Sequence, residues 1–168
     1  IKRLPAARPF VDGAELPLFG APLRIRHRGD MRGTVWREDG EIHVAGQAEH
    51  LPRRLRDWLT AELRCHLVPL VHAKAEKADR RVKRITLRDS RSRWGSCGPD
   101  ATLSFSWRLV FAPPEVIDYL AAHEVAHLVH LNHSPRFWSV ARSLCAGPIE
   151  GPQAWLKHNG ETLLQYGA

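Results

Sequence analysis

The beginning of the chain alternates apolar and polar residues with the period of a β-strand. Leu23 and Ile25 alternate with arginines, which predicts a strand with one buried face. Asp39-Gly40 separates two later short runs, and this dipeptide is typical of a tight hairpin turn. The predicted strands cover residues 23–26, 34–36 and 42–44. Residues 1–46 are therefore expected to form a β-rich segment.

Residues 47–78 change to the period of a helix. Leucines recur every four residues and form one apolar stripe, which consists of Leu55, Leu59, Leu63 and Leu67. A long helix is therefore predicted here. Pro69 is expected to kink or end it, because proline has no backbone N–H and its ring clashes with the preceding turn.

Residues 79–168 combine strands and helices. Strands are predicted over residues 85–88 and 103–107, with a polar loop over residues 90–97 between them. Helices are predicted from Pro113-Pro114 to about Leu131, from Ser134-Pro135 onward, and over residues 154–164 with an interruption at Asn159-Gly160. The chain contains no internal repeat or flexible linker, so these elements predict one α+β domain over residues 1–168.

The composition adds charge and redox information. The 168 residues include 25 Lys or Arg and 18 Asp or Glu, which gives a formal net charge of +7. Such a balance favours encounters with nucleic acids, nucleotides or other anions, although charges spread through the chain also fit a generally basic surface. The three cysteines form no Cys-x-x-Cys pair, which favours a reducing cytoplasm, and no apolar run is long enough for a membrane span.

The segment from His123 to His127 has the pattern His-Glu-x-x-His. Two histidines four positions apart lie on one face of a helix, with Cβ atoms about 5 to 6 Å apart, so one metal ion can bridge them. A catalytic zinc site has three protein ligands and leaves a fourth position for water. Glu124 lies beside the first ligand, where it can take a proton from that water. The pattern predicts a zinc hydrolase with one ion per chain.

The third ligand has to come from another segment. His133 lies just beyond the predicted helix end, and a turn at Asn132 can bring it back toward the first two histidines. Glu150 or Glu161 could serve instead, as in zinc peptidases that use a downstream glutamate. We rank His133 ahead of both.

Three stretches of the chain carry a family resemblance. They are residues 88–97 (RDSRSRWGSC), residues 107–119 with Trp107-Arg108-Leu109 and Val116-Ile117-Asp118-Tyr119, and residues 123–138 with the histidine motif, Asn132-His133-Ser134 and Phe137-Trp138. In this order they resemble the bacterial YgjP-like predicted zinc metallopeptidases, which are related to the SprT-like group.

The resemblance implies a fold and a set of roles. The fold is a single α+β, zincin-like domain in which a mixed or antiparallel sheet packs on the helix that carries the histidine motif. Residues 79–168 would form its catalytic core. The implied zinc ligands are His123, His127 and His133, with Glu124 as the base.

Several basic and aromatic residues near the motif are candidates for substrate contact. They are Arg91, Arg93, Trp94, Arg108, His130 and Arg136. The loop over residues 90–97 fits either a substrate-binding loop or a packed turn with its tryptophan in the core. The strand over residues 103–107 is a candidate sheet edge above the cleft, where an extended peptide would pair.

A metal-activated water can cleave more than one kind of bond. Peptide hydrolysis agrees with the resemblance, and the partner is then a peptide or protein. A second hypothesis is hydrolysis of a phosphoanhydride such as a nucleotide, although the chain has no Gly-rich phosphate loop. Its phosphates would be bound by Arg91, Arg93, Arg108 or Arg136. A third hypothesis, from the basic charge, is a nucleic-acid or ribosome-associated binding module with a structural zinc.

Overall fold

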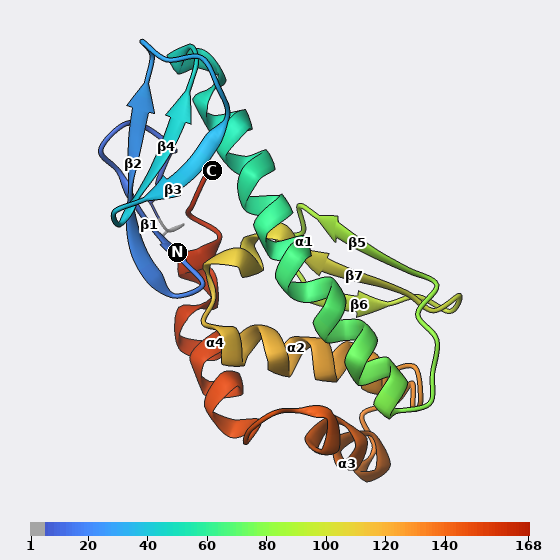
Figure 1. Ribbon diagram of the computed structural model, residues 1–168. Helices are drawn as coiled ribbons and strands as arrows, with labels where there is room; N and C mark the ends of the chain where they lie inside the picture. The colour runs from blue at the N-terminus through green and yellow to red at the C-terminus, as the bar shows by residue number, and fades with distance from the viewer. Residues whose placement is uncertain (1–5) are drawn as a thin grey trace.

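The computed structural model describes residues 6–168. Over this range the chain forms four α-helices and two small mixed sheets, an α+β arrangement (Figure 1). The long helix α1 (Leu51–Lys77) runs between the two sheets, and α2 (Pro114–Ala126) lies beside it. No helix within these residues combines the length and apolar character needed to cross a lipid bilayer.

The N-terminal sheet is built as the alternation of its residues predicts. It contains β1 (Glu15–Leu18), β2 (Ala21–Arg28), β3 (Val35–Glu38) and β4 (Glu41–Ala45), in the order β1-β2-β4-β3. Leu23 and Ile25 are buried against the core. The hairpin between β3 and β4 is confirmed, since Asp39 and Gly40 have the positive φ values, 51° and 74°, that a tight turn between twisted strands requires.

Helix α1 confirms the leucine stripe, whose four members are fully buried. Pro69 lies inside the helix, which continues to Lys77, so the expectation that proline ends it was wrong. The missing N–H of Pro69 leaves the carbonyl of Cys65 without its helical donor. Both residues are exposed, so water can satisfy that carbonyl without breaking the helix.

The second sheet differs from the predicted arrangement. It contains β5 (Arg84–Arg88), β6 (Gly95–Cys97) and β7 (Thr102–Ser106), in the order β5-β7-β6. β7 is central, with β5 parallel on one side and β6 antiparallel on the other. The prediction that the strand over residues 103–107 forms a sheet edge was therefore wrong. The edge that contacts α2 belongs to β6, a strand inside the segment predicted as a loop.

The helices after β7 lie close to their predicted positions, but α2 ends early and α4 begins four residues before its predicted start. A 3₁₀ turn, η2 (Trp107–Phe111), leads into α2. The helices α3 (Pro135–Leu144) and α4 (Glu150–Leu163) follow. A second 3₁₀ turn, η1 (Ala48–His50), precedes α1. α2 ends at Ala126, well before Leu131, which is 77% exposed. α4 continues through Asn159-Gly160 without the predicted interruption, and Gly160 is buried against Trp94.

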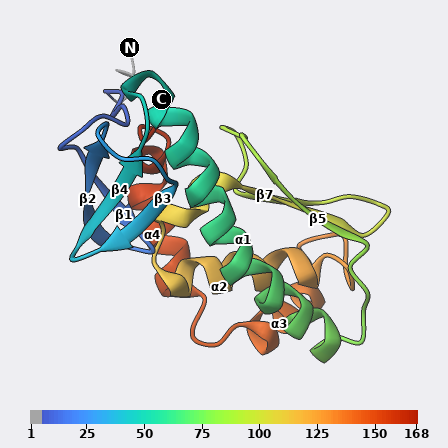
Figure 2. The same ribbon diagram turned by 45° about the horizontal axis from the view of Figure 1, so that its top comes forward.

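Helix α2 is the element that the others enclose. It contacts α1, α3, α4 and β6, and Figure 2 shows α1 crossing beside it with α3 near its end. Ala121 and Ala122 are fully buried, and their small side chains allow these neighbours to approach closely. The position of α2 is thus fixed from several sides.

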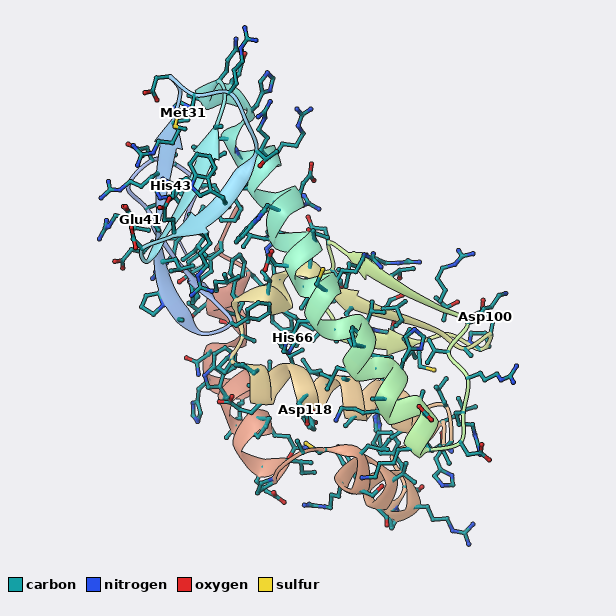
Figure 3. The ribbon with its side chains drawn as sticks, viewed as in Figure 1. Met31, Glu41, His43, His66, Asp100 and Asp118 are labelled. Atoms are coloured by element: carbon teal, nitrogen blue, oxygen red, sulfur yellow. The ribbon has the colours of Figure 1, made fainter. Side chains whose placement is uncertain are left out.

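A buried ion pair joins α1 to α2. Lys74 Nζ lies 2.7 Å from Asp118 Oδ1, and the two side chains are only 7% and 13% exposed. Lys74 also donates to the carbonyl of Leu144 at 2.6 Å, while Asp118 accepts from the N–H of Ala146 at 2.8 Å. The pair therefore connects α1, α2 and the link between α3 and α4; Figure 3 shows Asp118 on α2.

We expect Asp118→Asn to lower the free energy of unfolding by about 3 kcal/mol, because Lys74 would keep a buried charge without a counterion. Urea unfolding at pH 7 measures this change. Glu150→Gln is the control, since it removes the exposed partner of Arg142 and should have little effect. An Asp118→Asn protein as stable as the wild type would contradict a structural role for the pair.

Candidate metal centre

Three histidines meet where α2 ends. His123 and His127 are one helical turn apart, and the chain turns over residues 127–129 as it leaves the helix. This turn brings His133 back toward the other two. One ring nitrogen from each histidine lies within 4.8 Å of those of the other two.

The spacing of these nitrogens fits a single ion. Nε2 of His123 and Nε2 of His133 are 3.3 Å apart. Two nitrogens at about 2.0 to 2.1 Å from one zinc ion, at tetrahedral angles, lie about 3.3 to 3.4 Å apart. His133 is exposed and His123 is half-buried, so one side of the cluster faces solvent. The donor set therefore fits zinc with a position open to water.

The surroundings of His123 and His127 favour the neutral imidazole, the form that binds a metal. Burial, together with the charges of the neighbouring His127 and His133, lowers the pKa of His123 to about 4. Burial also lowers the pKa of His127. Nδ1 of His127 lies 3.2 Å from the carbonyl of His130 and can donate to it, which leaves Nε2 free as a ligand. Nδ1 of His123 is buried without a hydrogen-bond partner within residues 6–168.

The first turn of α3 forms an aromatic wall behind the cluster. The hydroxyl of Ser134 accepts a hydrogen bond from the N–H of Phe137, which confirms the predicted start of this helix. The Phe137 ring stacks on His127 with centroids 4.5 Å apart and an interplanar angle of 30°. Trp138 stacks on His133 at 5.8 Å and 26°. These contacts restrict the orientations of the histidine rings.

Glu124 lies on α2 beside the first histidine and is 4% exposed. Burial raises the pKa of its carboxyl to about 7, while the charge of Arg93 acts in the opposite direction. A carboxylate with a pKa near neutrality is suited to accept a proton from water and return it. A Cβ added to Gly95 of β6 would lie 2.7 Å from the Glu124 Oε2 atom, so only glycine leaves room for this carboxylate.

Arg108 does not have the environment expected of a substrate contact. It is 1% exposed, forms an ion pair with Asp89 and donates to the carbonyl of Tyr166 at 3.2 Å. Its guanidinium also lies over the ring of Trp107, 4.7 Å from the centroid. These contacts bury the guanidinium inside the fold, where a substrate would not reach it.

The other expected contact residues are spread around the centre. Arg91 and Arg93 are exposed in the segment before β6, whereas Trp94 is half-buried and packs on the core, which favours the packed-turn interpretation for its ring. Arg136 is exposed on α3. His130 contributes its backbone carbonyl to His127, and its side chain is half-buried.

Neither downstream glutamate joins the histidine cluster in the described chain. Glu150 lies at the start of α4, where its Oε1 atom is 2.6 Å from a nitrogen of Arg142. Glu161 lies on α4 next to the segment that carries Arg91 and Trp94. His133 is the residue that the fold brings to the other two histidines.

Comparison with known families agrees with this geometry. A model of the YgjP-like, metallopeptidase domain matches residues 1–159. The chain belongs to the YgjP-like family. A metallopeptidase domain implies a hydrolase that uses a metal ion and acts on a peptide or protein. No curated protein and no solved structure matches the chain.

The sequence analysis missed two features of this YgjP-like centre. One is the contact between Gly95 and Glu124, and the other is the wall formed by Phe137 and Trp138. A glycine in a strand often marks the close approach of another group, so Gly95 was the sequence signal that could have indicated its contact with Glu124. The aromatic wall forms because α3 packs against α2, and the spacing of residues within one helix does not predict how two helices pack.

The raised pKa of Glu124 predicts a pH-dependent stability in the metal-free protein. Below pH 4.5 the carboxyl is protonated in both states, but between pH 4.5 and about 7 only the folded state keeps the proton, so stability falls as the pH rises. Glu124→Gln removes this titration. We expect the wild type to lose about 2.5 kcal/mol relative to Glu124→Gln between pH 5 and pH 8. Urea unfolding of both proteins at both pH values tests this, and an unchanged difference would contradict the raised pKa.

Proposed function

We propose that this YgjP-like protein is a zinc-dependent peptidase with one ion per chain. His123, His127 and His133 would hold the zinc, and Glu124 would act as the general base. The observation that carries the proposal is the 3.3 Å spacing between nitrogens of His123 and His133, in a three-histidine cluster next to a buried carboxylate. The metallopeptidase family of the chain supports it.

The proposed reaction uses Glu124 twice. When bound, zinc would polarise the scissile carbonyl and lower the pKa of a water molecule. Glu124 accepts a proton from the attacking water as the water oxygen forms a bond to the carbonyl carbon. It then donates this proton to the leaving amide nitrogen as the C–N bond breaks, which returns the carboxylate to its starting form.

The edge of β6 is the proposed place for the substrate backbone. Trp94 accepts from the N–H of Ser106 at 2.9 Å, and Gly98 donates to Thr102 at 2.8 Å. Hydrogen-bonded pairs alternate in an antiparallel ladder, so the backbone groups of residues 95 and 97 point away from β7. They can pair with an extended peptide, as sheet edges do in β-strand addition. Gly95 of this edge contacts Glu124, which puts such a peptide beside the proposed base.

The two other hypotheses have weaker support. For phosphate binding by Arg91, Arg93, Arg108 or Arg136, Arg108 is buried and Arg136 lies on α3, while Arg91 and Arg93 line a hollow of about 190 Å³ against α4 whose lining includes none of the three histidines. A structural zinc normally has four protein ligands, whereas the cluster has three. The comparisons give no support for nucleic-acid binding.

The direct test is Glu124→Gln in the zinc-loaded protein. We expect the variant to retain its zinc and to lose at least about 100-fold in the rate of peptide hydrolysis, because a general base contributes that much or more. Glu115→Gln, on the same helix but exposed at its first turn, is the matched control.

The substrate class is tested with the same proteins. Unfolded proteins and nucleoside triphosphates are incubated separately with the wild type, and products are quantified by mass spectrometry. Cleavage of the unfolded proteins alone is expected. Full peptidase activity in Glu124→Gln would remove this residue from the mechanism, and hydrolysis of triphosphates alone would overturn the peptidase proposal.

Gly95→Ala provides a second prediction. The added methyl group would collide with the Glu124 carboxylate and displace it, so hydrolysis should fall about tenfold or more while zinc affinity stays close to that of the wild type. Gly147→Ala, where nothing lies within 4 Å of the new methyl group, is the control. Kinetics and a zinc titration measure the two effects. Unchanged hydrolysis in Gly95→Ala would show that the carboxylate position is not critical.

A further inference from the structure

The β5-β7-β6 sheet has a polar face on the side opposite its core. The register places Ser104 of β7 between Thr86 of β5 and Ser96 of β6. The hydroxyls of Thr86 and Ser104 are 2.7 Å apart and share a hydrogen bond. Leu103 and Phe105 of β7 alternate with these residues and are buried on the other side. This face is therefore lined with hydroxyl groups.

A hollow of about 150 Å³ lies over this face. Its polar side chains come from two arginines and four serines, which are Arg88, Arg93, Ser90, Ser96, Ser104 and Ser106. We call it the serine–arginine pocket. No acidic residue lines it. Its volume is sufficient for a carboxylate or a phosphoryl group.

The two guanidiniums of the serine–arginine pocket are not held in ion pairs, although the charge of Arg93 opposes the rise in the pKa of the Glu124 carboxyl. Asp89 lies next to Arg88 in the sequence, but its carboxylate pairs with Arg108 and lies 3.7 Å from Arg56. Within residues 6–168, neither Arg88 nor Arg93 has an ion-pair partner. Both side chains are exposed and available to a bound anion.

Two of the serine hydroxyls of the pocket keep a proton that they can donate. The oxygen of Ser90 accepts from the N–H of Arg93 at 3.2 Å, and the oxygen of Ser106 accepts from the N–H of Arg108 at 3.3 Å. A hydroxyl whose oxygen already accepts from the backbone keeps its proton for another partner. Arginine side chains have donors only. The pocket therefore presents an excess of donors, which an oxyanion satisfies.

The serine–arginine pocket borders the proposed substrate edge. Ser96 belongs to both, because it lies on β6 and lines the pocket. Successive side chains of a strand point to opposite faces of a sheet. In a peptide paired with β6, the residue opposite Ser96 would thus direct its side chain toward the pocket face, while Gly95 next to it contacts Glu124.

We propose that the serine–arginine pocket binds the oxyanion of an acidic side chain in the substrate, either a carboxylate or a phosphorylated hydroxyl. The substrate is then an acidic peptide segment that lies along β6 with this side chain opposite Ser96. The formal net charge of +7 favours the approach of such a segment. The inference rests on the proposed peptidase function and adds a substrate preference to it.

A peptide series tests the preference with the zinc-loaded protein. A single Glu is placed at successive positions of an unstructured peptide, and each peptide is compared with its Gln and phosphoserine counterparts. We expect kcat/KM to be about tenfold higher for the acidic peptide at one position, the ratio that one charge-assisted hydrogen bond gives. The larger of the Glu and phosphoserine effects identifies the preferred oxyanion.

Arg88→Gln should remove most of this preference. Arg84→Gln is the matched control, because Arg84 lies four residues earlier on the same face of β5 but does not line the pocket. The control should preserve the preference. Equal kcat/KM values for Glu, phosphoserine and Gln peptides at every position, or a preference that survives Arg88→Gln, would overturn the inference.

A binding measurement separates this inference from the peptidase proposal. The Glu peptide is added to ¹⁵N-labelled Glu124→Gln protein, and the amide signals of Ser96 and Ser104 are followed with and without Arg88→Gln. Shifts that require Arg88, with no peptide cleaved by the wild type, would support the pocket and overturn the peptidase function. Cleavage without such shifts would support the function and overturn the pocket, and the absence of both would overturn both.

Discussion

The close approach of three imidazoles at the end of α2 constrains the rest of the molecule. Positively charged rings at this distance would repel one another, and burial adds a further cost to charging His123. The fold therefore favours the neutral form of His123 and His127, and the three rings present nitrogens to a common point. The early end of α2 makes this possible, because a helix continued to Leu131 would carry the chain away before His133 could return.

Several contacts hold α2 and its histidines in place. The Lys74–Asp118 pair fixes one side of α2 to α1, and the aromatic rings of Phe137 and Trp138 pack against the histidines from α3. β6 closes the other side at Gly95, where the absence of a side chain leaves space for Glu124. Burial of the Glu124 carboxyl raises its pKa, which suits proton transfer but lowers the stability of the folded state at neutral pH.

The sequence predicted the features that depend on local spacing. The leucine stripe of α1 and the Asp39-Gly40 hairpin are examples, because one period or one turn type determines each. The nearness of His123 and His127 follows in the same way from helix geometry. His133 also lies where it was expected, although its role as a ligand stays a prediction.

The features that the sequence did not predict depend on contacts between distant segments. Three residues are too few to show a period, so β6 was expected to be a loop and β7 an edge. Arg108 was expected to contact the substrate, but the fold buries it, with Asp89 and Tyr166 as its partners. Pro69 was expected to affect α1 more strongly, yet its exposed position lets water replace the lost hydrogen bond.

Zinc content measured on single variants tests the three-histidine centre most directly. The wild type, once loaded with zinc and freed of excess ion, should contain one zinc per chain. His123→Ala, His127→Ala and His133→Ala should each lose it, whereas His130→Ala should retain it, because only the backbone of His130 contacts a proposed ligand. One tightly bound zinc in each of the first three variants would contradict coordination by this cluster.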